Sequence, residues 1–164
     1  MSSDLTWSRH IEYILARANK RIFAICQLVR CGFDHNDIVT VYCSLIRPVL
    51  EYASQVWHSG LTKTQSDEIE RVQRRCLHII YPQLSYYDAR AVSGLQLLSV
   101  RRENAVIKLF NEIKNPSHVL HYLLPMKPSR NGSVTRDKYP FELKCGKTSR
   151  RTHSMIYYCI GKRV

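Results

Sequence analysis

The segment from Ile38 to Trp57 constrains the fold more than any other part of this sequence. Its apolar residues surround most of a helical cylinder instead of alternating as they do in a half-buried strand. They are Ile38, Val39, Val41, Tyr42, Leu45, Ile46, Val49, Leu50, Ala53, Val56 and Trp57. Pro48 predicts a kink and not a stop, because the apolar periodicity continues through it. We therefore predict one kinked helix, capped by Asp34, as the most buried element, with Arg47 and Glu51 paired at the kink.

Helical periodicity also precedes this segment. From Ser8 to Val29 the apolar residues recur at spacings of three and four, which predicts a long helix that ends at Gly32. The apolar stripe consists of Ile11, Leu15, Ala18, Ile22, Ile25 and Val29. The basic residues lie mainly off this stripe, and they are Arg9, Arg17, Lys20, Arg21 and Arg30. This helix should be apolar on its inner side and basic on its outer side.

The region after Gly60 carries start and stop signals for further helices. These signals are Thr62 with Gln65, Pro82, Ser85 with Asp88, Gly94, Ser99 and the sequence Asn115-Pro116-Ser117. The first of these helices has Ile69, Val72, Cys76 and Ile79 on one side and Arg71, Arg74, Arg75 and His78 on the other. A short last helix is expected around residues 118–124. The sequence thus predicts an all-α fold, an irregular bundle of five to six helices over residues 5–125.

The sequence changes character after Pro125. Loop-forming residues are interleaved with basic ones, and apolar periodicity is almost absent. We predict that residues 126–164 form a basic, largely irregular tail, in which residues 155–160 form one strand or one helical turn.

Basic charge is the strongest compositional indication of a partner. The net charge is +12; residues 1–124 carry 15 Lys and Arg against 11 Asp and Glu, and residues 125–164 carry 10 against 2. Such a chain attracts polyanions, and the binding would depend strongly on salt. The other interpretation of these charges is a solvated tail with no dedicated ligand.

Two groups of basic residues are candidates for nucleic-acid binding. A helical face is expected from Lys20, Arg21, Arg71, Arg74 and Arg75, with Trp7 and Tyr13 close enough in sequence to offer stacking surfaces. The tail contributes Lys144, Lys147, Arg150 and Arg151. Contacts of this kind hold phosphates without reading sequence. A solvated helix face would explain the same residues.

No residue pattern predicts catalysis, a metal site or a cofactor. Phosphate-binding glycine loops and a nucleophile elbow are absent from the sequence. His118 and His121 lack two further ligands, and Cys43 with His58 fits core packing better than nucleophilic chemistry. The six cysteines form no Cys-x-x-Cys pair and are expected to be free, mostly buried thiols.

Several motifs resemble, in the same order, the region that follows the palm in LINE-type, jockey-like non-LTR retrotransposon reverse transcriptases. They are Leu5 to Ile11, Ala18 to Arg21, Tyr42 to His58, Leu61 to Ser66, Ile69 to Leu77, Leu84 to Tyr86, Gly94-Leu95, Arg101 to Glu103 and His121 to Pro125. The resemblance implies a helical thumb that grips the phosphates of a template-primer duplex. The family's Tyr-x-Asp-Asp element, further catalytic aspartate, endonuclease domain and zinc knuckle are absent from this sequence. The expected function is therefore that of a fragment of an RNA-directed DNA polymerase, without enzymatic activity, that binds DNA or an RNA–DNA duplex weakly and non-specifically.

Leu5 to Arg30 also resembles the short amino-terminal module of an alkylated-DNA repair protein of the AlkB-homologue type. His35-Asn36-Asp37 matches the His-x-Asp iron pair of its dioxygenase. That iron site belongs on jelly-roll strands, however, and here the pair begins a helix. The sequence thus leaves three hypotheses. The first is the polymerase fragment, and the second is a helical module that binds a protein partner through exposed apolar surface. The third is that the chain is part of an alkylated-nucleic-acid repair protein (dioxygenase/methyltransferase).

The sequence also bears on location. Arg47, Pro48 and Glu51 interrupt the longest apolar stretch, so no membrane span is expected. The residues Met1-Ser2-Ser3-Asp4 do not resemble a signal peptide. We expect an intracellular protein, nuclear or cytoplasmic, that is not secreted.

Overall fold

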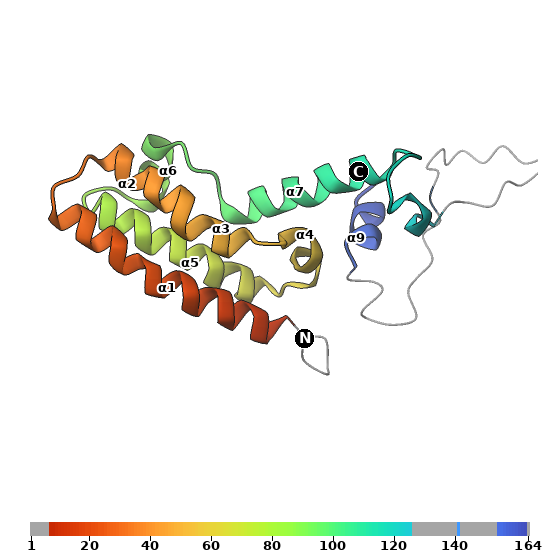
Figure 1. The fold of residues 1–164 in the computed structure, drawn as a ribbon, viewed down its shortest axis with the longest axis horizontal. Helices are drawn as coiled ribbons and strands as arrows, with labels where there is room; N and C mark the ends of the chain where they lie inside the picture. Colours follow the sequence, from red (N-terminus) through yellow and green to blue (C-terminus); the bar gives the residue numbers. More distant parts are fainter. Residues whose placement is uncertain (1–6, 126–140, 142–153, 164) are drawn as a thin grey trace, which may run out of the picture. The chain divides into compact units, whose positions relative to one another are not determined.

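The computed structural model describes residues 7–125, 141 and 154–163, and the regular structure among them is helical with no β-strand (Figure 1). The prediction of an all-α fold is confirmed. The chain forms two compact units, one of residues 1–54 and 61–102 and the other of residues 55–60 and 103–164. This division differs from the expected boundary between bundle and tail at residue 125. No described helix is both long enough and apolar enough to cross a membrane.

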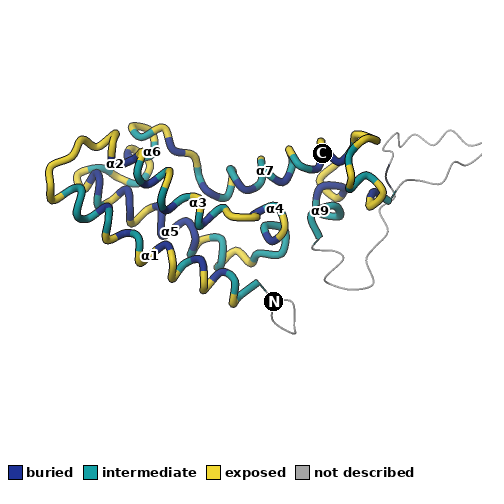
Figure 2. The backbone as a smooth tube through the Cα atoms, in the orientation of Figure 1, coloured by how far each residue is buried: buried dark blue, intermediate teal, exposed yellow. Residues whose placement is uncertain are grey.

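The first unit is built around two long helices, α1 (Ser8–Arg30) and α5 (Lys63–Ile80), which pack against each other more extensively than any other pair. The inner side of α1 is fully buried at Ile11, Ile14, Ala18, Ile22 and Ile25. Figure 2 shows buried and exposed residues alternating along both helices, as an amphipathic pattern requires. Gly32 ends the helix at φ +76°, with its N–H and that of Phe33 bonded to the carbonyls of Val29 and Leu28. This is a Schellman motif, so the predicted stop at Gly32 is confirmed.

The single kinked helix predicted over residues 35–57 is instead a series of shorter pieces. The α-helix α2 (His35–Val41), capped by Asp34, continues into a π-helical turn at Tyr42–Ile46, where the Arg47 N–H reaches the Tyr42 carbonyl. Pro48 lies in the first turn of α3 (Arg47–Glu51), where the missing donor costs little. The chain then turns away through Ala53, at φ +50°, into α4 (Ser54–Trp57). The prediction that the helix runs unbroken to Trp57 is therefore wrong.

Only one side of this segment is buried. Tyr42, Ile46 and Leu50 have no solvent exposure, whereas Tyr52 and Val56 are exposed. The π-helical turn and the break at Ala53 change the direction in which successive apolar residues point. The prediction that apolar residues around most of this segment are buried is therefore wrong.

The caps predicted for the next two helices are confirmed, whereas the helix predicted to start at Ser99 begins one residue earlier, at Leu98. Thr62 and Gln65 form a reciprocal capping box at the start of α5. Ser85 caps α6 (Tyr86–Ser93) by accepting from the Asp88 N–H. Gly94 then ends this helix at φ +66°.

Replacing Gly94 with alanine should lower the free energy of unfolding by about 1–2 kcal/mol, because a Cβ is disfavoured in the left-handed region. A Cβ at Gly94 would meet no atom within 4 Å, so backbone strain is the whole cost. Gly161→Ala is the matched control, since it also adds a Cβ to open space but at an ordinary helical φ. Urea unfolding should show a loss for the first variant and none for the second; equal stabilities would contradict the assignment.

The second unit has a separate apolar core. It contains η2 (His58–Gly60), residues 103–113 of α7 (Leu98–Ile113), η3 (His121–Leu123) and α9 (Met155–Gly161). The buried cluster consists of Val106, Phe110, Ile113, Leu124, Phe141, Cys159 and Ile160. Three of these residues, Phe141, Cys159 and Ile160, lie in the segment predicted to be a basic, largely irregular tail. Of the two alternatives for residues 155–160, the helical one is correct.

Candidate nucleic-acid interface

The predicted basic side of α5 is present in the structure. Arg71, Arg74, Arg75 and His78 are all exposed, and their spacing of three and four residues places them along one side of the helix. The opposite side is buried at Ile69, Val72, Gln73, Cys76, Leu77 and Ile80. Among the described residues, none of the ion pairs involves these arginines. We call Arg71, Arg74 and Arg75 the α5 arginine face.

Arg74 is held beside α6. Its guanidinium carbon lies 5.0 Å from the centroid of the Tyr86 ring, and that of Arg90 lies 5.7 Å from the same ring. Arg90 Nε also donates to the Leu95 carbonyl at 3.2 Å. Cation–π contact limits the conformational freedom of Arg74 without neutralising its charge. The Tyr86 hydroxyl is itself fixed by a hydrogen bond to Glu70.

A groove of about 390 Å³ lies between α1 and α5 at the edge of the α5 arginine face. It is lined by Glu12, Leu15, Asn19, Glu68, Arg71, Val72 and Arg75. Two glutamates therefore border the arginines on the α1 side. A bound polyanion would be repelled from this edge, so the favourable direction for phosphates runs along α5 and toward α6.

Lys20 and Arg21 do not extend the α5 arginine face. Arg21 Nη1 donates to the Leu45 carbonyl at 2.5 Å and so links α1 to the π-helical turn. Lys20 is exposed, but it follows groove-lining Asn19 by one residue and is therefore rotated by about 100° around α1. The five candidates expected on one face thus divide into the α5 arginine face, a structural arginine and a lysine on the outer side of α1.

A buried polar network beneath the arginines was not predicted. Gln73, without solvent exposure, accepts from the Tyr42 hydroxyl at 2.7 Å and donates to the Gln96 carbonyl and Tyr86 Oη, each at 3.0 Å. Glu70 accepts from Tyr86 Oη and, at 3.0 Å, from the N–H of Leu98, the first residue of α7. Burial, followed by the hydrogen bond to Glu70, raises the pKa of Tyr86. The sequence signal for this network was the presence of two polar residues, Glu70 and Gln73, among the apolar positions of α5.

The Arg101-Arg102 pair, part of the resemblance to reverse transcriptases, has structural contacts. Arg101 forms a two-pronged ion pair with Glu51 at 2.6 and 3.1 Å, while Arg47, the predicted partner of Glu51, lies 3.9 Å away. Arg102 is fully buried and donates to Ser66 Oγ at 2.9 Å. Burial lowers the pKa of its guanidinium, and the charges of Glu70 and Glu51 oppose that shift. These contacts give both arginines a structural role within the first unit.

The histidines singled out in the sequence make local contacts. Their partners are the Tyr81 ring for His35, with ring centroids 5.0 Å apart, the Leu120 N–H for His118 and the Ile113 carbonyl for His121. No cluster of three His, Cys, Asp or Glu that could hold a metal occurs in the described part of the chain. His35 and Asp37 begin a helix, so they lack the strands on which a dioxygenase places its iron ligands.

The described thiols are free but not mostly buried. Cys76 and Cys159 are buried, Cys26 and Cys43 are half-buried, and Cys31 is exposed. Burial raises the pKa of Cys76 to about 12 and that of Cys159 to about 11, which makes both poor nucleophiles. Cys43 and His58 belong to different units. Cys145 and the tail candidates Lys144, Lys147, Arg150 and Arg151 lie outside the described residues.

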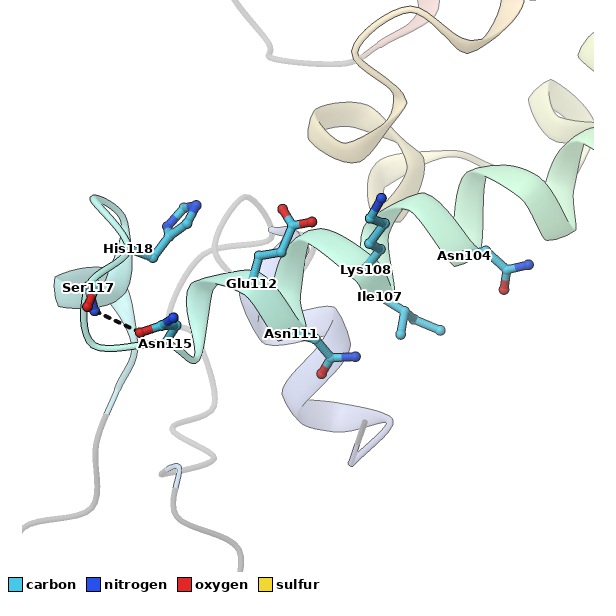
Figure 3. Close-up of a pocket in the computed structure, with 8 residues that line it drawn as sticks. All are labelled: Asn104, Ile107, Lys108, Asn111, Glu112, Asn115, Ser117 and His118. Carbon is cyan, nitrogen blue, oxygen red and sulfur yellow. Dashed lines mark hydrogen bonds between the residues drawn. The ribbon is translucent and has the colours of Figure 1, made fainter.

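A broader depression of about 840 Å³ follows α7 in the second unit (Figure 3). Its lining consists of Asn104, Ile107, Lys108, Asn111, Glu112, Asn115, Ser117 and His118. Asn115 is engaged as the acceptor of the Ser117 N–H at 3.0 Å. Lys108 is the only lysine or arginine in this lining, and Glu112 is one turn away. The depression therefore lacks the concentrated positive charge of the α5 arginine face.

Comparisons of the chain with protein-family models, with curated proteins and with solved structures found no match. The likeness to reverse transcriptases thus stands on the motifs in the sequence alone.

Proposed function

We propose that this chain is a non-enzymatic nucleic-acid-binding module, a fragment derived from the thumb of a LINE-type reverse transcriptase, which holds duplex phosphates on the α5 arginine face. The observation that carries the proposal is the set of three exposed arginines within two turns of one helix, unpaired with any described carboxylate. Guanidinium groups match the geometry of phosphate oxygens and can bind them through two hydrogen bonds.

The way in which α5 is packed against its neighbours also favours binding. Its opposite side is buried against α1 and the polar network, so the three arginines project from a rigid backbone. A preorganised face loses less conformational entropy on binding than charges on a flexible loop. Arginine contacts to phosphates do not read sequence, so the proposed partner is DNA or an RNA–DNA duplex of any sequence.

The test is a fluorescence-anisotropy titration of duplex DNA at 50 and 200 mM salt, as points on opposite sides of physiological ionic strength. In the triple variant with Arg71, Arg74 and Arg75 replaced by alanine, the slope of log K against log salt should fall by up to about 2.7, or about 0.9 per lost phosphate contact. The matched control replaces the same residues with lysine, which keeps the charges. It should retain most of the slope.

The contribution of the tail needs a different variant. Deleting residues 126–164 would remove Phe141, Cys159 and Ile160 from the core of the second unit. Neutralising Lys144, Lys147, Arg150 and Arg151 with glutamine in the full chain avoids this damage. If the alanine triple variant binds like the parent while the glutamine variant does not, the tail is the site and the proposal for α5 fails.

The protein-interaction alternative has one observation in its favour. Val119, Tyr122 and Leu123 are exposed near each other in sequence around η3. Trp7 and Tyr13, the aromatic residues of the expected basic face, do not add to this apolar surface, because Trp7 is half-buried against His10 and the exposed Tyr13 ring is accompanied by the cation Arg17, which donates to its hydroxyl. If the parent does not bind duplex even at 50 mM salt, this alternative becomes the better hypothesis.

A further inference from the structure

The outer side of α1 combines exposed aromatic rings with positive charge. Tyr13 is 56% exposed and Phe23 is 66% exposed. Helix α1 already buries five residues on its inner side, so packing of the core does not account for these two outer rings. The basic residues on the same side are Arg9, Arg17 and Lys20, all exposed. We call these five residues the outer face of α1.

The rings and cations alternate along the helix. Tyr13 and Phe23 are about 15 Å apart along the axis, at a rise of about 1.5 Å per residue. Arg17 and Lys20 lie between them in sequence. Arg17 Nη1 donates to Tyr13 Oη at 3.0 Å, and its guanidinium carbon lies 5.5 Å from the ring centroid. This contact holds one ring and one cation together at the surface.

The five residues of the outer face of α1 include no carboxylate. Glu12 is the only carboxylate in α1, and it lines the groove toward α5 together with Leu15 and Asn19. Arg9 and Lys20 form no ion pair among the described residues. The outer face of α1 is therefore purely cationic, and Glu12, Asn19 and Glu68 separate it from the α5 arginine face.

We propose that the outer face of α1 binds single-stranded nucleic acid, with bases stacked on Tyr13 and Phe23 and with phosphates held by Arg9, Arg17 and Lys20. Aromatic platforms interleaved with cations are the arrangement by which proteins bind single strands without sequence preference. The bases of a duplex are already stacked on one another. A duplex would therefore contact the cations through its phosphates, and no base would stack on Tyr13 or Phe23. The proposal does not depend on the α5 arginine face, whose neighbouring Tyr86 ring is half-buried and already contacted by Arg74 and Arg90.

An anionic membrane surface would attract the three cations of this face, but it would not account for the two aromatic rings. Binding to a bilayer interface requires a continuous apolar side that enters the headgroup region. Here the apolar side of α1 is buried in the core of the first unit, and only two rings project outward. Single-stranded nucleic acid therefore fits the observations better.

The test compares oligothymidylate with duplex DNA of equal length in anisotropy titrations of the full chain. Replacing both Tyr13 and Phe23 with alanine should weaken oligothymidylate binding about tenfold or more, since each stacked base contributes about 1–3 kcal/mol. Duplex binding should change less than twofold. Tyr122→Ala is the matched control, because Tyr122 is 77% exposed and belongs to the second unit, and it should leave both affinities unchanged.

Two further variants separate the interpretations. Tyr13→Phe with Phe23→Tyr keeps both rings and should bind oligothymidylate like the parent. The alanine triple variant of α5 should retain oligothymidylate binding, so the two proposals can fail independently. The inference is overturned if the parent does not bind oligothymidylate, if the double alanine variant binds it normally, or if the parent binds vesicles of anionic phospholipid and not oligothymidylate.

Discussion

The Leu50→Ala variant is expected to lose about 2–5 kcal/mol of the free energy of unfolding, the range observed when a large buried aliphatic side chain is truncated. Leu50 has no solvent exposure and lies in α3, which packs against α1. Its removal leaves a cavity that these helices can fill only by moving. Urea unfolding followed by circular dichroism measures the loss as a lower midpoint at unchanged slope.

Val92→Ala is the matched control for this substitution. Val92 is 62% exposed on α6 in the same unit, so its truncation should change the stability by no more than about 0.5 kcal/mol. Val49→Ala should fall between the two, because Val49 is half-buried one position before Leu50. If Leu50→Ala unfolds together with Val92→Ala, then α3 does not contribute to the core as described.

The comparison of Leu50 with Val49 shows what the sequence could and could not predict. Apolar periodicity placed Leu45, Val49 and Leu50 in the core equally, because all three fit one continuous helix. The π-helical turn at Tyr42–Ile46 and the break at Ala53 depend on which neighbours the segment meets. Alanine has no local preference for φ +50°, so no sequence signal marked that position.

Helix ends were predictable because their signals are local. The Gly32 and Gly94 terminators and the Thr62 and Ser85 caps satisfy backbone groups within a few residues, so spacing alone identifies them. The exposure of Arg71, Arg74 and Arg75 followed in the same way from the helical period. Their separation from Lys20 and Arg21 did not, since it depends on how α1 is rotated against α5.

The burial of Glu70 and Gln73, in contrast, could not be predicted from the sequence. Polar residues within a helical pattern are ordinarily assigned to solvent, and here both are buried at the meeting of Tyr42, Tyr86 and the start of α7. Their partners come from segments 13 to 31 residues away in the chain. No single spacing encodes such a network, so only the folded structure reveals it.

The Glu70→Ala variant should lose about 3 kcal/mol of the free energy of unfolding. The substitution removes the acceptor of the buried Leu98 N–H and of the Tyr86 hydroxyl, and each buried polar group left unsatisfied costs about 1–3 kcal/mol. Glu70→Gln keeps a carbonyl oxygen of similar position and should lose less than half as much. Glu68→Ala is the control on the same helix, because Glu68 lines the open groove and should be nearly neutral.

Hydrogen exchange distinguishes this network from simple packing. Loss of the Glu70 carboxylate frees the first N–H of α7, so the Leu98 amide should exchange faster in Glu70→Ala under conditions where the rest of the first unit stays protected. The Leu50→Ala variant should instead speed exchange throughout that unit, because a cavity lowers the global stability. A uniform acceleration in both variants would mean that Glu70 contributes only to overall packing. Selective exposure of Leu98 would show that one carboxylate on α5 holds the start of α7 in place beneath the arginines.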